Sequence, residues 1–274
     1  MSRGYMGKLL WVDLGTGDMT EEQLTDDFCR KYIGGYAFGT KILFDRTKPG
    51  VDPLGPDNML GFLTGVLTGT PAIIGSRYVV VCKSPLTNTW GDANSGGFFG
   101  PELKFAGYDG VFFTGASDKP VYLSIIEGKA ELHDAASLWG KDTNETEDTL
   151  KETYGDKARV ACIGPSGEAL SLISCIINHK GRAAGRSGVG AVMGSKKLKA
   201  VVVQGTATVP MADEAAAKAL RNRILKDERD AGESFKKHGS CSITADSAMS
   251  GDSPVKNWGG VGPVDFPNAK AISD

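Results

Sequence analysis

Short apolar runs alternate with turns and helix-forming segments along the first part of the chain. Lys8–Leu14 (KLLWVDL) predicts a strand, and the turn Gly15–Asp18 returns the chain into a polar second strand. A helix is predicted from Thr25 and Asp26 to about Asp45, because Thr and Asp favour the first positions of a helix. The pattern then predicts two strands, a glycine-rich loop, a short helix and a strand: Asn58–Leu63, Arg77–Cys82, Ala93–Gly97, Phe99–Ala106 and Gly110–Thr114.

The same order of elements recurs after residue 120. Val121–Ile126 predicts a strand that turns at Glu127–Lys129 into a second strand, Ala130–His133. A helix follows at Thr143–Tyr154, and then two strands at Arg159–Ile163 and Ser171–Ile177. The glycine-rich loop is Gly181–Gly190, and a short helix through Gly194 leads to the last strand, Lys199–Val203.

The recurrence indicates an internal duplication. At an offset of 90 residues Gly100 aligns with Gly190, and the pairs Val111 and Val201, and Gly115 and Gly205, align as well. We therefore predict an α+β domain of two like halves, about residues 6–115 and 120–205, with mixed or antiparallel sheets and one glycine-rich loop per half. A pseudo-two-fold axis between the halves would make the two loops face each other. Chance similarity among short strands and glycines is the alternative.

The pattern changes after Pro210. Asp213–Asp227 predicts a helix, and 16 of the 44 residues from Ala231 onward are Gly, Pro or Ser, with almost no periodicity. We expect a first domain at residues 1–210. Residues 211–274 are expected to hold one helix and the irregular start of a second, helical domain.

Composition narrows the classes of function. The 274 residues include 37 glycines, about 13% against a usual ~7%, and they lie between apolar runs, where the backbone turns sharply or approaches a ligand. A net charge of −2 gives no general attraction to nucleic acid or to a lipid surface. No apolar stretch has the length of a membrane span, and Met1–Lys8 does not resemble a signal peptide. No two of the five cysteines form a CxxC pair for zinc or an iron–sulfur cluster. Cys82, Cys162 and Cys175 each lie in an apolar run, so we expect buried, reduced thiols and a cytoplasmic protein.

The strongest candidate for chemistry is the second glycine-rich loop, in which Arg182 and Arg186 frame small residues. Freely turning glycines expose backbone N–H groups beside the two guanidinium groups, and this combination suits phosphate or another multi-oxygen anion. A short helix that opens at Gly188–Gly194 would add the positive end of its dipole. The alternative is an ordinary glycine-rich hairpin with solvated arginines.

The first glycine-rich loop (Gly91–Gly97) offers small polar groups and open backbone. Arg77 begins the strand upstream of it and is the counterpart of the arginines of the second half, or else a plain surface charge.

Other motifs match poorly. Gly188–Gly194 fits G-x-G-x-x-x-G, but the next strand ends in Gln204 and Gly205 where a dinucleotide fold has an acidic residue. A standalone nucleotide-binding domain remains a rival hypothesis. No Ser/His/Asp or HExxH spacing is present, so the sequence nominates no catalytic residue.

Taken together, the two loops and their flanking strands strongly resemble the N-terminal domain of the aldehyde ferredoxin oxidoreductase family. The resemblance runs from about Tyr5 to Pro210 and continues weakly to Trp258. Its matching stretches are GKLLWVDLGTGD, LTGT, GSRYVVVCKSPLT, ANSGGFFGPELKFAGYDG, IGPSGE and GRAAGRSGVGAVMGSKKLKAVVVQG. The ELKFAGYD and RAAGRSGVGAVMGSKKLKA runs are highly specific.

The resemblance implies a tungsten or, less often, molybdenum bis-pterin cofactor, with Mg²⁺ bridging the two pterin phosphates. It implies oxidation of aldehydes to carboxylic acids, with ferredoxin taking the electrons through a [4Fe–4S] cluster. Carried over by motif, the cofactor-binding residues are Arg77, Asn94, Ser95, Gly96, Arg182, Ala183, Gly185 and Arg186. The backbone carbonyls of Asn94 and Ala183 would hold the magnesium ion, and the cofactor metal would be bound by pterin sulfurs.

In one respect the chain departs from the family. Family proteins are more than twice as long, and their cluster cysteines, catalytic Glu and His and substrate pocket lie downstream of the region that ends at Asp274. We therefore expect a fragment that is inactive alone, or else a non-catalytic, cofactor-carrying subunit of a split enzyme. Aldehyde and ferredoxin are the implied partners, neither nucleic acid nor a membrane is, and a homo-oligomer is left open.

Overall fold

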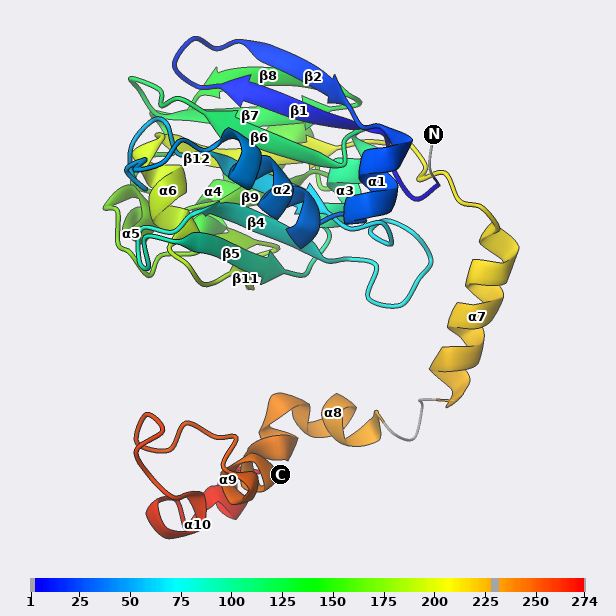
Figure 1. The fold of residues 1–274 in the computed structure, drawn as a ribbon, viewed down its shortest axis with the longest axis vertical. Coiled ribbons are helices and arrows are strands. Elements are labelled where there is room, and N and C mark those ends of the chain that lie inside the picture. The colour runs from blue at the N-terminus through cyan, green and yellow to red at the C-terminus, as the bar shows by residue number, and fades with distance from the viewer. Residues whose placement is uncertain (1–2, 228–231, 274) are drawn as a thin grey trace. The chain divides into compact units, whose positions relative to one another are not determined.

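The computed structural model describes residues 3–227 and 232–273. By its internal contacts the chain divides into two compact units, Met1–Glu214 and Ala215–Asp274 (Figure 1). Within the described residues, the strands all belong to the first unit, as do both glycine-rich loops.

The first unit is built on two six-stranded mixed sheets. In spatial order the first sheet contains β2 (Met19–Gln23), β1 (Lys8–Asp13), β6 (Gly110–Thr114), β3 (Leu60–Thr64), β4 (Tyr78–Lys83) and β5 (Trp90–Ser95). The second contains β8 (Lys129–Asp134), β7 (Val121–Ile126), β12 (Leu198–Gln204), β9 (Arg159–Cys162), β10 (Ile176–Asn178) and β11 (Arg182–Ala184).

The two sheets have the same strand order. When each is numbered from its own first hairpin, the order is second, first, sixth, third, fourth and fifth strand. The pairing directions agree as well, since β1 and β6, and likewise β7 and β12, are parallel, whereas the other pairs are antiparallel. The fifth strand, β5 or β11, is therefore an outermost strand in each sheet.

Helices form the layers between and outside the sheets. The short helices α3 (Phe99–Phe105) and α6 (Val189–Ser195) each contact strands of both sheets. On its outer face the first sheet is covered by α1 (Asp26–Tyr32) and α2 (Tyr36–Arg46), and the second sheet by α4 (Thr143–Tyr154) (Figure 1). One further helical turn, α5 (Pro165–Glu168), packs against α6.

Burial on both faces explains the nearly continuous apolar strands. Successive side chains of a strand point to opposite faces, so Leu10 and Val12 lie in the core between the sheets while Leu9 packs under α1 and α2. Likewise Phe62 faces the central core and Leu63 the outer one. A strand with both faces covered has no polar face, which is why these runs lack clear alternation.

Two glycines let the central helices approach the strands in the same way. A Cβ on Gly100, the second residue of α3, would lie 3.2 Å from the carbonyl oxygen of Ser76, just before β4. A Cβ on Gly190, the second residue of α6, would lie 2.7 Å from the carbonyl oxygen of Cys175, just before β10. Each helix thus contacts the backbone that leads into the fourth strand of its own half.

Four of the predicted elements need correction. The single helix predicted from Thr25 to Asp45 is wrong, because Ile33, Gly34 and Gly35 take φ values of 63°, 141° and 51° and separate α1 from α2. The backbone N–H of Gly35 instead donates to the carbonyl of Thr64 in β3, at 2.9 Å. The strand predicted at Ser171–Ile177 begins only at Ile176. Both glycine-rich loops contain strand residues, since β5 runs to Ser95 and β11 lies at Arg182–Ala184.

The second unit is helical in the part of the chain that the structure describes. Its elements are α7 (Glu214–Asp227), α8 (Glu233–His238), η1 (Gly239–Ile243), α9 (Thr244–Ser250), α10 (Gly262–Asp265) and η2 (Ala269–Ile272). The expectation of an irregular segment from Ala231 onward is therefore wrong for residues 233–250, which are helical, whereas residues 251–261 hold no helix or strand; Ala231 itself lies outside the described residues. None of the helices in residues 3–227 and 232–273 is long and apolar enough to cross a membrane.

Candidate cofactor site between the two sheets

β5 and β11, one outermost strand from each sheet, lie beside each other, and this brings the two glycine-rich loops together (Figure 1). Ser187 of the second loop forms hydrogen bonds to β5 of the first loop. Its hydroxyl donates to the carbonyl of Asp92 in β5 at 2.9 Å, and the Asp92 N–H donates back to that hydroxyl at 3.2 Å. The hydroxyl of Ser84 donates to the carbonyl of Ser187 at 2.9 Å. Residues about 100 positions apart in the sequence therefore form one structure.

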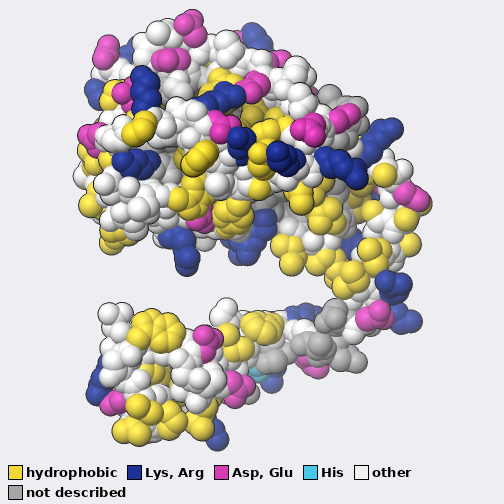
Figure 2. Space-filling model, in the orientation of Figure 1, with side chains coloured by type: hydrophobic (Ala, Val, Ile, Leu, Met, Phe, Trp, Pro, Cys, Tyr) yellow, Lys and Arg dark blue, Asp and Glu magenta, His cyan; other side chains and the backbone are white. Residues whose placement is uncertain are grey.

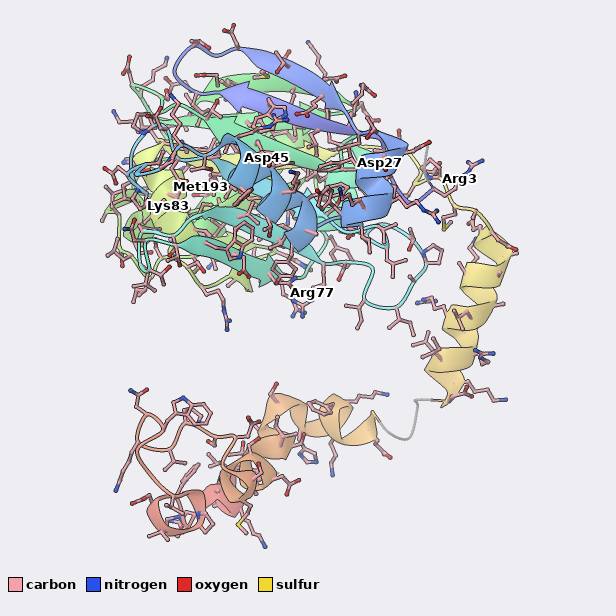
Figure 3. The ribbon with its side chains drawn as sticks, viewed as in Figure 1. Arg3, Asp27, Asp45, Arg77, Lys83 and Met193 are labelled. Atoms are coloured by element: carbon pink, nitrogen blue, oxygen red, sulfur yellow. The ribbon has the colours of Figure 1, made fainter. Side chains whose placement is uncertain are left out.

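A polar cavity of about 350 Å³ lies where the loops meet. Its walls come from both halves of the first unit: Ser76, Arg77, Gly96, Gly97, Gly181, Arg182 and Ala183. Arg77 and Arg182 are both exposed, and Arg77 points away from the strands at the edge of the unit (Figure 3). Two guanidinium groups, one from each half, thus border a single cavity.

An apolar cavity of about 470 Å³ adjoins it, and Arg77 lines both. Asn94 also borders the apolar cavity, together with residues 33–36 at the break between α1 and α2, residues 65–68, and Ile73 and Ile74. Ile33 and Ile74 in its wall are 61% and 73% exposed. The region therefore combines a cationic compartment with an apolar one. Elsewhere on the visible face, Lys and Arg alternate with Asp and Glu (Figure 2).

Most of the residues predicted from the sequence meet at these cavities. Arg77, Gly96, Arg182 and Ala183 line the polar cavity, and Asn94 lines the apolar one. Ser95 is buried directly beside them.

Gly185 and Arg186 are exposed after β11 and line neither cavity. Conversely, Ser76, Gly97 and Gly181 line the polar cavity without having been singled out from the sequence. Each adjoins a predicted residue, so the signal was their position next to Arg77, Gly96 and Arg182.

The cavity suits an anionic group that contacts the backbone. An added Cβ on Gly96 would come no closer than 3.8 Å to Arg77 Nη1, and one on Gly181 would meet no atom within 4 Å. Small residues therefore leave room beside the main chain. As outermost strands, β5 and β11 also have one row of N–H and C=O groups that their own sheets do not pair. Guanidinium groups and free backbone donors match phosphate oxygens, and free carbonyls match a hard cation.

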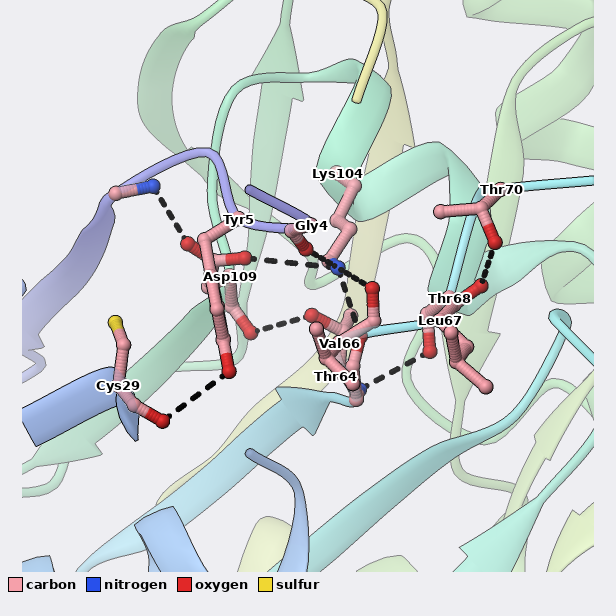
Figure 4. Close-up of polar contacts among 12 residues, drawn as sticks. Gly4, Tyr5, Cys29, Thr64, Val66, Leu67, Thr68, Thr70, Lys104 and Asp109 are labelled. Atoms are coloured by element: carbon pink, nitrogen blue, oxygen red, sulfur yellow. Dashed lines mark hydrogen bonds and ion pairs between the residues drawn. The ribbon is translucent and has the colours of Figure 1, made fainter. Parts of the chain in front are cut away.

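The segment that leads to Arg77 is held from inside the domain (Figure 4). The hydroxyl of Thr68 donates to the carbonyl of Arg77 at 2.7 Å and accepts from the N–H of Gly65 at 3.0 Å. Lys104 is fully buried, and its Nζ donates to the carbonyls of Gly4 at 2.6 Å and Gly65 at 2.7 Å. The Asp109 carboxylate lies 3.8 Å from this Nζ. A buried cation thus fixes the wall of the apolar cavity and the start of β4.

Burial sets the protonation of this pair. Desolvation lowers the pKa of Lys104 to about 8, with the Asp109 charge opposing the shift. Desolvation raises the pKa of the Asp109 carboxyl, opposed by Lys104 and by the N–H of Gly7 that donates to it at 2.7 Å. The pair is internal and does not line the polar cavity, so it acts on the site through the backbone.

The cysteines lie apart from the site. Cys29, Cys82 and Cys162 are buried, and burial raises the pKa of the Cys82 and Cys162 thiols to about 12. Cys175, predicted to be buried in a strand, is only half-buried because it lies just before β10, and Cys241 is exposed. Across the part of the chain that the structure describes, no three His, Cys, Asp or Glu side chains group as metal ligands would.

Comparisons with known proteins agree with this fold. Residues 9–205 match the family model described as "Aldehyde ferredoxin oxidoreductase, N-terminal domain". The tungsten-containing aldehyde ferredoxin oxidoreductase of Pyrococcus abyssi is 45% identical over 93% of this chain and 43% of its own length. The WOR-like subunit of an aliphatic sulfonate oxidoreductase from Pyrococcus furiosus is 37% identical over 75% of this chain and 35% of its own length.

A solved structure matches as well. It is the active-site complex BamBC of benzoyl coenzyme A reductase with 1,5-dienoyl-CoA, which superposes with a TM-score of 0.82 at 39% identity, over 85% of this chain and 36% of the other. The chain thus spans less than half the length of these relatives. The match over residues 9–205 and the identity to the Pyrococcus enzyme establish that the chain belongs to the aldehyde ferredoxin oxidoreductase family.

Proposed function

We propose that residues 1 to about 210 are the cofactor-binding domain of a tungsten-type, or molybdenum-type, oxidoreductase that converts aldehydes to carboxylic acids with ferredoxin as electron acceptor. The observation that carries the proposal is the polar cavity in which Arg77 and Arg182 meet from opposite halves. Aldehyde is the proposed substrate class because relatives named for that activity match over 93% of the chain. Three buried thiols fit a reducing, cytoplasmic location.

The proposed cofactor is a tungstopterin with two pterins, and its phosphates are the groups that the site would hold. Arg77 and Arg182 would donate charge-assisted hydrogen bonds to the phosphate oxygens, and Asn94, Ser95, Gly96, Ala183 and Gly185 would contribute polar or backbone contacts. Arg186 would add positive charge from outside the cavity. When bound, the cofactor supplies two-electron redox chemistry at its metal, whereas these residues bind and orient it.

Two further groups complete the proposal. A magnesium ion would bridge the pterin phosphates and be held by the backbone carbonyls of Asn94 and Ala183, which belong to the two outermost strands. The [4Fe–4S] cluster and the contact with ferredoxin would belong to parts of the full-length enzyme outside residues 1–274. Residues 211–274 would begin its second domain.

We further propose that the first unit is an internal repeat of about residues 6–115 and 120–205. The shared strand order and the matching roles of Gly100 and Gly190 support this proposal. Superposing the two ranges tests it. An r.m.s. difference no better than that of unrelated mixed sheets would refute it.

The cofactor role is tested by metal and pterin content. The full-length protein would be produced with the cofactor-synthesis machinery as wild type, Arg77→Ala, Arg182→Ala and Arg186→Ala. Arg30→Ala is the matched control, since Arg30 is an exposed arginine on α1 that lines neither cavity.

A charge-assisted hydrogen bond contributes about 1.5–3 kcal/mol, so retention should weaken about 10- to 150-fold for Arg77→Ala and Arg182→Ala. A smaller loss is expected for Arg186→Ala and none for Arg30→Ala. Equal tungsten and pterin content in all five proteins would refute the proposed function.

A further inference from the structure

One buried amide joins the two sheets beside the polar cavity. Asn178, the last residue of β10, is 1% exposed. Its Nδ2 lies 2.9 Å from Tyr78 Oη and 3.0 Å from Ser95 Oγ, both in the first sheet, and 3.2 Å from the carbonyl oxygen of Arg182 in the second. Tyr78 and Ser95 are paired across β4 and β5, as Asn178 and Arg182 are across β10 and β11. The amide therefore bridges one strand pair of each sheet.

Each partner of Asn178 is a proposed cofactor residue or adjoins one. Tyr78 directly follows Arg77, Ser95 lies between Asn94 and Gly96, and Arg182 is itself a cavity residue. The position of this single side chain therefore affects the backbone beside both guanidinium groups.

The other end of the amide has no hydrogen bond. Asn178 Oδ1 is buried without a partner among the described residues. It lies against the backbone of Gly97, where an added Cβ would be 2.4 Å from it, and Gly97 lines the polar cavity. Through its Nδ2 the amide thus holds both strand pairs, and through its Oδ1 it contacts the backbone of the first loop.

We propose that Asn178 is a positioning residue for the cofactor site, which holds the two glycine-rich loops at the separation that lets Arg77 and Arg182 bind one anionic group. This inference rests on the proposed function. Asn178 acts through the backbone of both loops and does not itself bind the cofactor.

An Asn178→Asp variant separates positioning from packing, because the two side chains have the same size and shape. An ionised carboxylate has no donor for the Arg182 carbonyl, and it brings a negative charge to the edge of an anion site. A protonated carboxyl is neutral and has one O–H donor, so it restores part of the bridge. Burial favours protonation of a carboxyl, and lowering the pH should therefore rescue the variant.

The experiment measures binding of inorganic pyrophosphate to the full-length protein purified without its cofactor. Titration calorimetry at constant ionic strength would compare wild type and Asn178→Asp between about pH 5.5 and pH 8, and the readout is the ratio of their Kd values. At pH 8 we expect the Kd of Asn178→Asp to be about ten times that of wild type or more, which corresponds to the loss of one charge-assisted hydrogen bond to an arginine. This ratio should fall towards unity at pH 5.5. Asn178→Leu, which packs but cannot donate, should bind weakly with a ratio that does not change with pH.

The outcomes are distinct. A ratio near one at every pH, or a raised ratio that does not fall as the pH is lowered, overturns the inference. If wild type binds pyrophosphate no better than Arg77→Ala and Arg182→Ala do, the proposed function fails and the inference fails with it. If Asn178→Asp does not fold, Ser95→Ala, which changes a proposed cofactor residue, is the control for the double variant Tyr78→Phe/Ser95→Ala, which cuts the same bridge from the other sheet without adding charge. Unchanged pyrophosphate affinity in that variant also overturns the inference.

Discussion

A methyl group added at Gly97 should destabilise the first unit markedly. Gly97 has a φ of 87°, a backbone conformation that side chains with a Cβ rarely adopt. Its added Cβ would lie 2.4 Å from Asn178 Oδ1 and 3.3 Å from Arg182 Cγ. Asn178 cannot simply turn aside, because its Nδ2 is held by contacts to Tyr78, Ser95 and Arg182. Gly97→Ala must therefore distort the loop or break the bridge between the sheets.

The size of the effect follows from these two costs. The left-handed conformation costs a residue with a Cβ about 1–2 kcal/mol, and overpacking of a buried site costs about 1–3 kcal/mol. The free energy of unfolding of Gly97→Ala should thus be about 2–5 kcal/mol lower than that of wild type. For a unit of this size the melting temperature falls by about 2–4 °C for each kcal/mol, so a decrease of about 4–20 °C is expected.

The neighbouring glycine is the control for this measurement. Gly96 has no left-handed φ, and its added Cβ would come no closer than 3.8 Å to another side chain. Gly96→Ala should therefore leave stability within about 0.5 kcal/mol of wild type, as ordinary surface changes do. Urea denaturation of the three proteins, followed by tryptophan fluorescence, gives the comparison. Equal stability of Gly97→Ala and Gly96→Ala would show that the approach of Asn178 to Gly97 is not close in solution.

Three further outcomes are expected. With a thiol reagent under native conditions, exposed Cys241 should react within minutes and half-buried Cys175 more slowly. The three buried thiols should react only on unfolding: Cys29, Cys82 and Cys162. Rapid labelling of more than two thiols would contradict the packing. Because burial lowers the pKa of Lys104 to about 8, the unfolded chain holds a proton that the native one lacks between pH 8 and the ordinary lysine value near 10.4. The stability of wild type relative to Lys104→Met should then rise with pH by about 1 kcal/mol per unit in that window, and a constant difference would mean that Lys104 stays charged. The 274-residue chain alone should hold no iron–sulfur cluster and oxidise no aldehyde, which about four irons per chain or measurable turnover would disprove.

Local signals predicted most of the elements of the first unit. Gly110–Thr114, Val121–Ile126 and Thr143–Tyr154 match the structure in type and bounds, because each combines a strong apolar or capping pattern with clear turn residues at its ends. Asp142 and Glu145 form a capping box at the start of α4, which is a purely local feature.

The errors occurred where distant contacts decide the local structure. The break between α1 and α2 is stabilised by the hydrogen bond from Gly35 to Thr64, about 30 residues away, although the Gly34–Gly35 pair is also a local turn signal that the helical pattern overrode in the prediction. The strand residues inside both glycine-rich loops pair with neighbours in their sheets, although small and polar residues there predict a loop. The sequence could therefore nominate Arg77 and Arg182, but it could not show that Ser187 and Asn178 bring their loops together.

Under the proposed function, the composition of the site would also explain how one domain can occur in enzymes named for different substrates. The polar cavity is lined by two arginines, a serine, an alanine and glycines, which can hold an anionic cofactor but offer no acid, base or nucleophile to a reacting group. The relatives that share this part of the chain are named for aldehydes, for aliphatic sulfonates and for benzoyl coenzyme A. If the cavity binds the cofactor as proposed, it would constrain phosphate binding and leave substrate choice to other parts of the full-length protein. Changes at Arg77, Asn178 or Arg182 should accordingly alter how much cofactor is held, without altering which substrate the loaded enzyme prefers.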